Sequence, residues 1–305
     1  MRAEVLPKIV RIRDITLRDG FQNIKEWIPS ETKEEVVDAL VAAGVASVEA
    51  TSFVSPRAIP QLADADRIAR YILEKYPRVE VLALVPNMRG AQNAANAGIS
   101  AVSYNISASE PHNKANINRT QAESLADLAG ISGALPDLAI NLSMSMVFGC
   151  PFIGKIPLDS VLQLTKEACK RGASSVTLCD TIGVANPLQV QALLEVFRAE
   201  FPELPLSLHM HDTHGMGLAN IFAALQMGVT TFETAAGGLG GCPFAPGAAG
   251  NTSSEDALNM LNRMGIATGV DLPKFLEAVA VIKQKIPVPL PGRLAAARPY
   301  FEFDF

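Results

Sequence analysis

The chain has 305 residues, of which 49% are hydrophobic and 19% are charged, and its formal net charge is −5. This composition is sufficient for a large buried core and excludes an intrinsically disordered chain. The negative net charge also argues against general binding to nucleic acids or to anionic membranes.

Two features of the sequence bear on where the protein resides. No uninterrupted hydrophobic run reaches the roughly 18 residues of a membrane span, and residues 1–8 lack the hydrophobic core of a signal peptide. The four cysteines show no CxxC spacing, which is typical of reduced thiols in a cytosolic protein. We therefore expect a globular cytoplasmic protein that binds neither a membrane nor a nucleic acid.

The predicted elements alternate regularly along the chain. Short runs of β-branched and hydrophobic residues are each followed by a segment with helical spacing, and several of these segments end in a glycine suited to a helix C-terminus. Such glycines are Gly44, Gly98, Gly172 and Gly228. In chain order, we predict eight strands near residues 9–17, 46–52, 79–85, 101–107, 138–148, 174–180, 205–211 and 229–235.

Eight strands that alternate with helices predict an α/β fold with a parallel sheet, and eight is the number that closes a (β/α)₈ TIM barrel. Such a barrel needs roughly 250 residues, so we expect one catalytic barrel over residues 1–285. An open doubly wound sheet is the competing fold. Two small domains are the competing organisation.

The last segment, residues 286–305, differs in kind from the rest. Its four prolines prevent a regular helix or a central strand, and they are Pro287, Pro289, Pro291 and Pro299. We expect a short proline-rich C-terminal extension outside the barrel. Its aromatic end either packs on a surface or a neighbouring subunit, or is loosely ordered.

The strongest chemical signal lies at the end of the seventh predicted strand, in His209-Met210-His211. Because side chains alternate along a strand, both imidazoles point to one face while Met210 points to the other. Reactive groups of a TIM barrel come from the carboxyl ends of its strands, so this position favours function over a packed core histidine. Two neutral imidazoles and a carboxylate are typical ligands of a divalent cation. We choose Asp19 as the carboxylate.

A second signal follows the first predicted strand, in Arg18-Asp19-Gly20. In most proteins such a sequence is an ordinary turn. If Asp19 binds a cation, however, Arg18 places a permanent positive charge beside it, suited to a carbonyl oxygen that becomes an enolate. Other polar residues also stand in or after predicted strands, namely Glu49, Asn105, Ser107, Asp180 and Asn251.

A glycine-rich segment follows the eighth predicted strand and runs from Gly237 to Asn251. Its composition is typical of a loop that closes over a site. Cys242 would lie on this loop, exposed enough to react. Phosphate binding is the rival interpretation, but the segment lacks both a GKS or GKT sequence and the GxGxxG spacing.

At these residues the sequence resembles the 3-hydroxy-3-methylglutaryl-CoA (HMG-CoA) lyase family, a group of metal-dependent barrels that act on carbon–carbon bonds next to carbonyls. The resemblance extends from Arg13 to about Lys285. It depends on the sequences Arg18-Asp19-Gly20-Phe21-Gln22-Asn23, Glu49-Ala50-Thr51-Ser52-Phe53-Val54-Ser55-Pro56, Gly149-Cys150-Pro151-Phe152, Asp180-Thr181-Ile182-Gly183, His209-Met210-His211-Asp212 and Gly240-Gly241-Cys242-Pro243, with Asn251 beyond.

The resemblance implies a lyase that cleaves an HMG-CoA-type thioester to acetyl-CoA and a keto acid, acetoacetate, as in leucine degradation. It implies a divalent metal ion, Mg²⁺ or Mn²⁺ with Zn²⁺ or Co²⁺ as further candidates, bound by Asp19, His209, His211 and Asn251. Arg18 would polarise the thioester carbonyl, Glu49 and Asp180 would line the site, and Cys242 would assist proton transfer. The implied catalytic residues are Arg18, Asp19, Glu49, Asp180, His209 and Cys242.

Departures from the family pattern keep related functions open. Residues 14–17 are closer to the condensing members of the wider group, while Phe21 and His214 differ from the expected lyase and would reshape the acyl pocket. A related substrate such as citramalyl-CoA is one alternative. A condensing acyltransferase of the isopropylmalate or homocitrate synthase type is another, although it usually carries a larger region after the barrel.

Two more alternatives and two expectations about partners complete the analysis. A biotin-dependent carboxyltransferase is disfavoured because its biotin and carbamylated-lysine apparatus has no counterpart in the sequence. A non-catalytic metal- or CoA-binding barrel is the alternative of another class, since fold alone does not exclude it. We expect an acyl-CoA thioester as substrate and a homo-oligomer, either a dimer or a tetramer.

Overall fold

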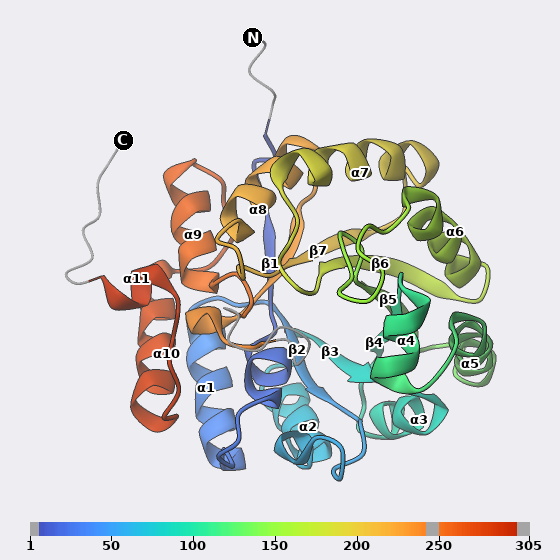
Figure 1. The fold of residues 1–305 in the computed structure, drawn as a ribbon. Coiled ribbons are helices and arrows are strands. Elements are labelled where there is room, and N and C mark those ends of the chain that lie inside the picture. The colour runs from blue at the N-terminus through green and yellow to red at the C-terminus, as the bar shows by residue number, and fades with distance from the viewer. Residues whose placement is uncertain (1–5, 242–249, 298–305) are drawn as a thin grey trace.

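Eight parallel strands form a closed barrel at the centre of the molecule (Figure 1). The computed structural model describes residues 6–241 and 250–297. The strands pair in sequence order and β1 pairs with β8, which confirms the predicted TIM barrel and excludes the open sheet. Their bounds are β1 Arg11–Asp14, β2 Ser47–Ser52, β3 Glu80–Val85, β4 Ala101–Ser107, β5 Ala139–Ser145, β6 Ala173–Asp180, β7 Leu206–Met210 and β8 Thr231–Thr234.

The helices form a layer around this barrel, as Figure 1 shows. Between the strands run α1 Ser30–Ala42, α2 Ala65–Lys75, α3 Met88–Asn96, α4 Glu110–Ile117, α5 Gln121–Ala134, α6 Leu158–Cys169, α7 Pro187–Glu200 and α8 Gly217–Gln226. After β8 come α9 Ser254–Arg263, α10 Leu272–Lys285 and α11 Arg293–Ala296. Three short turns complete the set: the π-helical η1 Thr16–Gly20 and the 3₁₀ turns η2 Pro60–Leu62 and η3 Ala236–Gly238.

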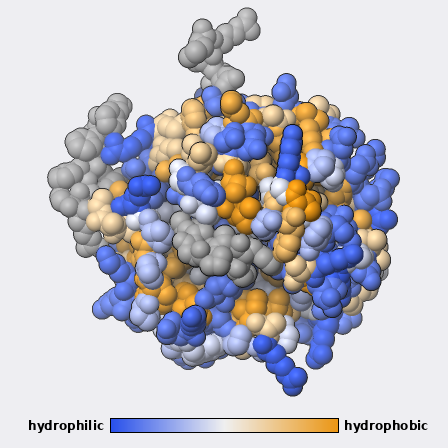
Figure 2. All heavy atoms as spheres, in the orientation of Figure 1, coloured by the Kyte–Doolittle hydropathy of each residue, from blue (hydrophilic) through white to orange (hydrophobic). Residues whose placement is uncertain are grey.

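The hydrophobic core follows the pattern expected of an α/β barrel. All residues of β2 are buried, as are those of β7, because the strands contact the outer helices on one face and fill the barrel on the other. Helix α1 buries Val36, Val37 and Leu40 at helical spacing. In the face drawn in Figure 2, hydrophilic residues dominate the outer edge and hydrophobic ones form patches nearer the middle.

The first strand is shorter than the predicted range 9–17. It ends at Asp14, whose Oδ1 accepts a hydrogen bond from the Thr16 backbone N–H at 2.9 Å. The carbonyl of Ile15 then accepts N–H groups from both Asp19 and Gly20, so the chain coils into η1 instead of extending. The consequence is that Asp19 lies on a tight turn at the barrel mouth rather than on a strand.

The described part of the C-terminal extension, residues 286–297, packs against the turn that follows β8. We name it the C-terminal strap. The Gly292 N–H donates to the Gly237 carbonyl at 2.9 Å, and the Gly237 N–H donates to Glu255 Oε2. The backbone of Arg293 donates to Asp256 on α9. Within the described ranges, no helix has both the length and the hydrophobicity to cross a membrane.

Candidate active site

Three potential metal ligands meet at the carboxyl end of the barrel. Asp19 comes from η1, His209 from β7 and His211 from the position directly after β7, and one ligand atom of each lies within 4.8 Å of the others. The two Nε2 atoms are 3.1 Å apart. All three side chains are buried, with exposed fractions of 5–6%. This arrangement follows from the alternation along β7, which turns Met210 to the opposite face.

Asn251 adds a fourth polar side chain to this cluster. Its Nδ2 donates to Asp19 Oδ2 at 2.8 Å and to the Leu239 carbonyl at 2.8 Å. Its Oδ1 is buried and has no hydrogen-bond partner in the described part of the chain, which is costly unless something else binds it. A cation beside Asp19 would satisfy that carbonyl oxygen, so the residues present fit a divalent metal ion.

Gly240 allows the close approach of the chain to this cluster. Its φ is +105°, and a Cβ there would lie 2.3 Å from Asn251 Nδ2 and 3.0 Å from Asp19 Oδ2. Any residue other than glycine would therefore displace the amide that pairs with Asp19.

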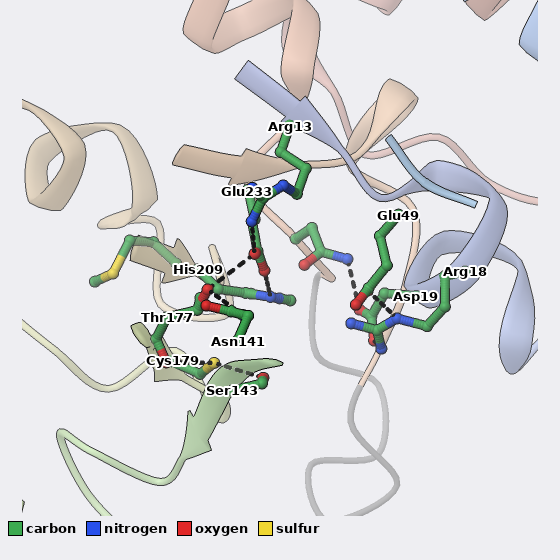
Figure 3. Close-up of polar contacts among 12 residues, drawn as sticks. Arg13, Arg18, Asp19, Glu49, Asn141, Ser143, Thr177, Cys179, His209 and Glu233 are labelled. Carbon is green, nitrogen blue, oxygen red and sulfur yellow. Dashed lines mark hydrogen bonds and ion pairs between the residues drawn. The ribbon is translucent and has the colours of Figure 1, made fainter. Parts of the chain in front are cut away.

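Arg18 lies between two carboxylates at the edge of the cluster (Figure 3). Its NH1 donates to Asp19 Oδ1 at 2.6 Å, and its Nε donates to Glu49 on β2. Gln22 also donates to Asp19 Oδ1, at 2.8 Å. The guanidinium is therefore fixed in place next to the potential ligands, because Glu49 accepts a hydrogen bond from its Nε side.

The local electrostatics set the charge of each ligand. Burial favours a higher pKa for Asp19, but Arg18 and the two histidines outweigh it and lower that pKa to about 2. Burial lowers the pKa of His211 to about 3, so this imidazole is neutral at physiological pH. Burial also acts to lower the pKa of His209, yet its hydrogen bond to Glu233 raises it. An ionised carboxylate beside a neutral imidazole suits a divalent cation.

The site opens into a cavity of about 540 Å³. Its wall includes Arg18, Asp19 and both histidines, and also Asn105 from β4, as its predicted position suggested. The wall also contains Arg119 and His112, together with hydrophobic and small polar residues, among them Val54, Ala58, Ile59, Pro86, Ile117, Ser143 and Ser145. A mainly apolar cavity with a few converging polar groups is the usual form of a small-molecule site.

Comparison with known proteins identifies the family. The HMGL-like family model matches residues 9–282. The chain belongs to the HMGL-like family. The chain is 44% identical to the Bacillus subtilis hydroxymethylglutaryl-CoA lyase over 94% of its length and 96% of the relative's. It is 38% identical to a (R)-citramalyl-CoA lyase from Chloroflexus aurantiacus, covering 96% of each chain.

Solved structures of HMGL-like proteins agree with this assignment. The crystal structure of the B. subtilis HMG-CoA lyase matches with a TM-score of 0.92 at 43% identity, covering 95% of this chain and 98% of that one. An HMG-CoA lyase from Acinetobacter baumannii, solved in complex with coenzyme A and 3-methylmalate, matches with a TM-score of 0.91 at 36% identity. It covers 97% of this chain and 98% of its own. The resemblance inferred from the sequence is confirmed.

Other predicted residues of this HMGL-like chain lie differently. Asp180 ends β6 and is buried, but its two oxygens accept hydrogen bonds from the backbone of Val184 and Ala185, each at 3.0 Å. Among the described residues, the cavity wall contains its neighbours Cys179 and Thr181 and not Asp180 itself. Burial raises the pKa of Asp180 to about 6. Its observed contacts are those of a residue that holds the loop after β6.

Three further expectations concern residues around the site. Phe21 is fully buried in the core, and His214 contacts the Gly183 carbonyl through Nδ1 at 2.7 Å. Neither is among the residues that line the described cavity, so an effect of either on the acyl pocket would have to be indirect. Ser107 is buried and accepts the Ser109 N–H instead of facing the cavity. Cys242 lies outside the described residues.

Sequence reasoning missed Glu233. This residue stands in β8, and its Oε2 lies 3.0 Å from His209 Nδ1. The predicted strand 229–235 contained it, and a glutamate within a strand of a buried sheet is itself an unusual signal. Its pairing with a histidine from the neighbouring strand required the register of β7 against β8, which places His209 opposite Glu233.

Proposed function

We propose that this chain is a divalent-metal-dependent carbon–carbon lyase that cleaves HMG-CoA to acetyl-CoA and acetoacetate. The observation that carries the proposal is the cluster of Asp19, His209 and His211 with Arg18 fixed at its edge. Membership of the HMGL-like family and the similarity to HMG-CoA lyases support the same activity.

The metal would be held by the two histidines, Asp19 and the unsatisfied Oδ1 of Asn251. Mg²⁺ or Mn²⁺ is our first choice, with Zn²⁺ or Co²⁺ as further candidates, because the donor set mixes imidazole nitrogen with oxygen. When bound, such an ion supplies a Lewis acid that lowers the pKa of a coordinated hydroxyl group.

Arg18 would bind the thioester carbonyl oxygen of the substrate. Loss of the proton from the tertiary hydroxyl lets its oxygen form the carbonyl of the keto acid, while the adjacent carbon–carbon bond breaks. The electron pair of that bond passes to the acetyl-CoA fragment as an enolate, whose negative oxygen the guanidinium would stabilise. Glu49 would keep the guanidinium in position, since it binds the Nε side.

A proton must then reach the carbon of the acetyl-CoA enolate. We assign this step to Cys242, as a thiol is able to return a proton to carbon and this residue lies in the sequence between Gly240 and Asn251, both of which lie at the site. Asp180 would act nearby through the loop after β6, whose backbone it binds. The acyl chain and the pantetheine arm would occupy the cavity, which suits an acyl-CoA thioester.

The direct test is turnover of purified protein. Incubation with HMG-CoA and Mn²⁺ or Mg²⁺ should release acetyl-CoA and acetoacetate in equal amounts, and exhaustive chelation should abolish the release. Failure with every tertiary 3-hydroxyacyl-CoA would contradict the proposal and favour a barrel that only binds metal or CoA.

A second candidate substrate is citramalyl-CoA, because a relative with that activity is 38% identical over 96% of the chain. The same assay should compare kcat/KM for the two thioesters. A higher value for citramalyl-CoA would transfer the proposal to that substrate and leave the reaction class unchanged. A homo-oligomer remains our expectation, and light scattering coupled to size-exclusion chromatography would measure it.

A further inference from the structure

Glu233 connects the potential metal site to the interior of the barrel. Its side chain is 3% exposed, and Oε2 contacts His209 Nδ1 at 3.0 Å (Figure 3). A carboxylate only accepts hydrogen bonds, so the proton of a neutral His209 must lie on Nδ1. That leaves the Nε2 lone pair facing His211 and Asp19, where a metal ligand needs it.

The other oxygen of Glu233 is bound on the side away from the site. Arg13 NH1 donates to Oε1 at 3.2 Å, and the Thr177 hydroxyl donates to it at 3.0 Å. Thr177 in turn accepts Asn141 Nδ2 at 3.0 Å. Contacts from β1 and β6 thus fix the carboxylate on β8, so it presents Oε2 to His209 in a single orientation.

The second histidine has no such support. Nδ1 of His211 is buried and has no hydrogen-bond partner in the described ranges 6–241 and 250–297. The two imidazoles therefore differ, although they are two residues apart on one strand face. His209 is oriented by the barrel interior, whereas His211 is held through packing and the backbone bridge to Asn251.

We propose that Glu233 is the positioning residue of the metal site, which fixes the tautomer and the orientation of His209 so that Nε2 can bind a divalent cation. The inference deepens the proposed function and rests on metal binding by this site. It assigns a role to a β8 residue that contacts His209 but is not itself one of the potential ligands.

The test compares Mn²⁺ binding by the full chain and its Glu233→Gln variant, using isothermal titration calorimetry. A glutamine preserves volume, but its amide can donate to Nδ1 and so favour the tautomer with the proton on Nε2. We expect Mn²⁺ affinity to fall about 10- to 100-fold, as for other residues that orient metal-binding histidines. An affinity equal to wild type in a folded variant would overturn the proposal.

Glu80→Gln is the matched control. Glu80 also binds Arg13, at 3.4 Å, but it lies at the start of β3 with a side chain that is 40% exposed. Its loss removes one carboxylate from the same arginine without touching His209. We expect unchanged Mn²⁺ affinity, and a drop equal to that of Glu233→Gln would show that charge balance around Arg13, not orientation of His209, sets the affinity.

A second readout needs no metal. Nitrogen-15 NMR of the imidazole groups in metal-free protein should show His209 protonated on Nδ1 in wild type and shifted toward Nε2 in Glu233→Gln. If Glu233→Gln does not fold, Thr177→Val removes one bond to Oε1 at similar volume and should weaken Mn²⁺ binding by a smaller factor. Wild-type protein that binds no Mn²⁺ would instead contradict the proposed function itself.

Discussion

At the scale of single residues, Arg18 has the most directly testable role. Its planar group bonds Asp19 through NH1 and Glu49 through Nε, and a lysine cannot reproduce this two-sided geometry. We expect Arg18→Lys to fold and to bind Mn²⁺, while kcat falls about 10²- to 10³-fold. Calorimetry and the acetyl-CoA assay measure the two properties. A kcat close to wild type would contradict the assignment of enolate stabilisation to Arg18.

Asp180 leads to a prediction about pH. Burial raises the pKa of its carboxyl to about 6 in the folded chain, against an ordinary value of 3.8. Its protonated form therefore favours folding, so this contribution is present below about pH 4 and is lost as the pH rises through about 6. In Asp180→Asn, the free energy of unfolding should decrease less between these pH values than in wild type. Denaturation at a series of pH values measures both slopes.

Asp14 serves as the comparison for that experiment. Burial raises its pKa to about 6 as well, and it lies across the barrel in β1, where it binds Thr16 and Ser254. Its contribution should remain in Asp180→Asn, so the slope should flatten without vanishing. A slope identical to that of wild type would show that Asp180 is ionised in the folded chain throughout this range.

From the sequence we could predict the site residues whose position depends on a single strand and the turn after it. His209 and His211 share a strand face by alternation, and Asp19 and Arg18 follow the first strand. Glu233 could not be assigned a role because its partner is set by the register between β7 and β8, which involves residues 24 positions apart. The orientation of Asp180 toward backbone amides also depends on a turn that local pattern does not specify.

At the scale of elements, the π-helical turn η1 is the feature that no strand pattern indicated. The hydrophobic residues Ile15 and Leu17 continue the alternation of a strand, which is why the predicted strand was too long. Hydrogen bonds from two successive amides to the Ile15 carbonyl decide the turn instead. π-helical turns of this kind often occur at functional sites, and here one carries both Arg18 and Asp19.

The C-terminal strap gives a prediction of its own. A Cβ on Gly292 would lie 2.2 Å from Glu255 Oε1, although the backbone angles there (φ −52°) suit any residue. Gly292→Ala should therefore destabilise the fold by about 1–3 kcal/mol through overcrowding at the strap. Urea denaturation measures the change. A free energy of unfolding equal to that of wild type would mean that the C-terminal strap can shift to accommodate the added methyl group without destabilising the fold.

Gly133→Ala is the control for this substitution. Gly133 lies in the last turn of α5, and no atom beyond its chain neighbours and its own helix backbone lies within 4 Å of the added Cβ. Because alanine favours helix more than glycine does, by up to about 1 kcal/mol, the variant should be as stable as wild type or slightly more so. An equal loss of stability in both variants would mean that the loss in Gly292→Ala is not specific to the strap.

At the scale of the whole molecule, a bound cation should stabilise the barrel. The potential ligands come from η1, from the end of β7 with the residue after it, and from the segment after β8, so an unfolded chain cannot present them together. At a free Mn²⁺ concentration one hundred times the dissociation constant, the gain is about 2.7 kcal/mol. Thermal denaturation with Mn²⁺ and with excess chelator should show a higher Tm with metal. Equal Tm values would contradict metal binding at this site.

The barrel itself could be predicted because its signals repeat. The prediction of eight alternating strands and helices depends on many residues at once, among them helix-ending glycines such as Gly44 and Gly172. Errors at single strand ends therefore leave the predicted topology unchanged. The site is less redundant, since each distance in it depends on one side chain. This difference explains why the fold was predicted more completely than the contacts of Glu233 and Asn251.

The hydrogen bond between Asp19 and Asn251 spans 232 positions of the sequence. During synthesis the first of these residues leaves the ribosome long before the second, so the complete ligand set arises only when nearly all of the chain has emerged. A cation therefore cannot bind the complete ligand set of a partly synthesised barrel. Loading with metal would instead report that the chain has emerged past Asn251 and that the barrel has closed.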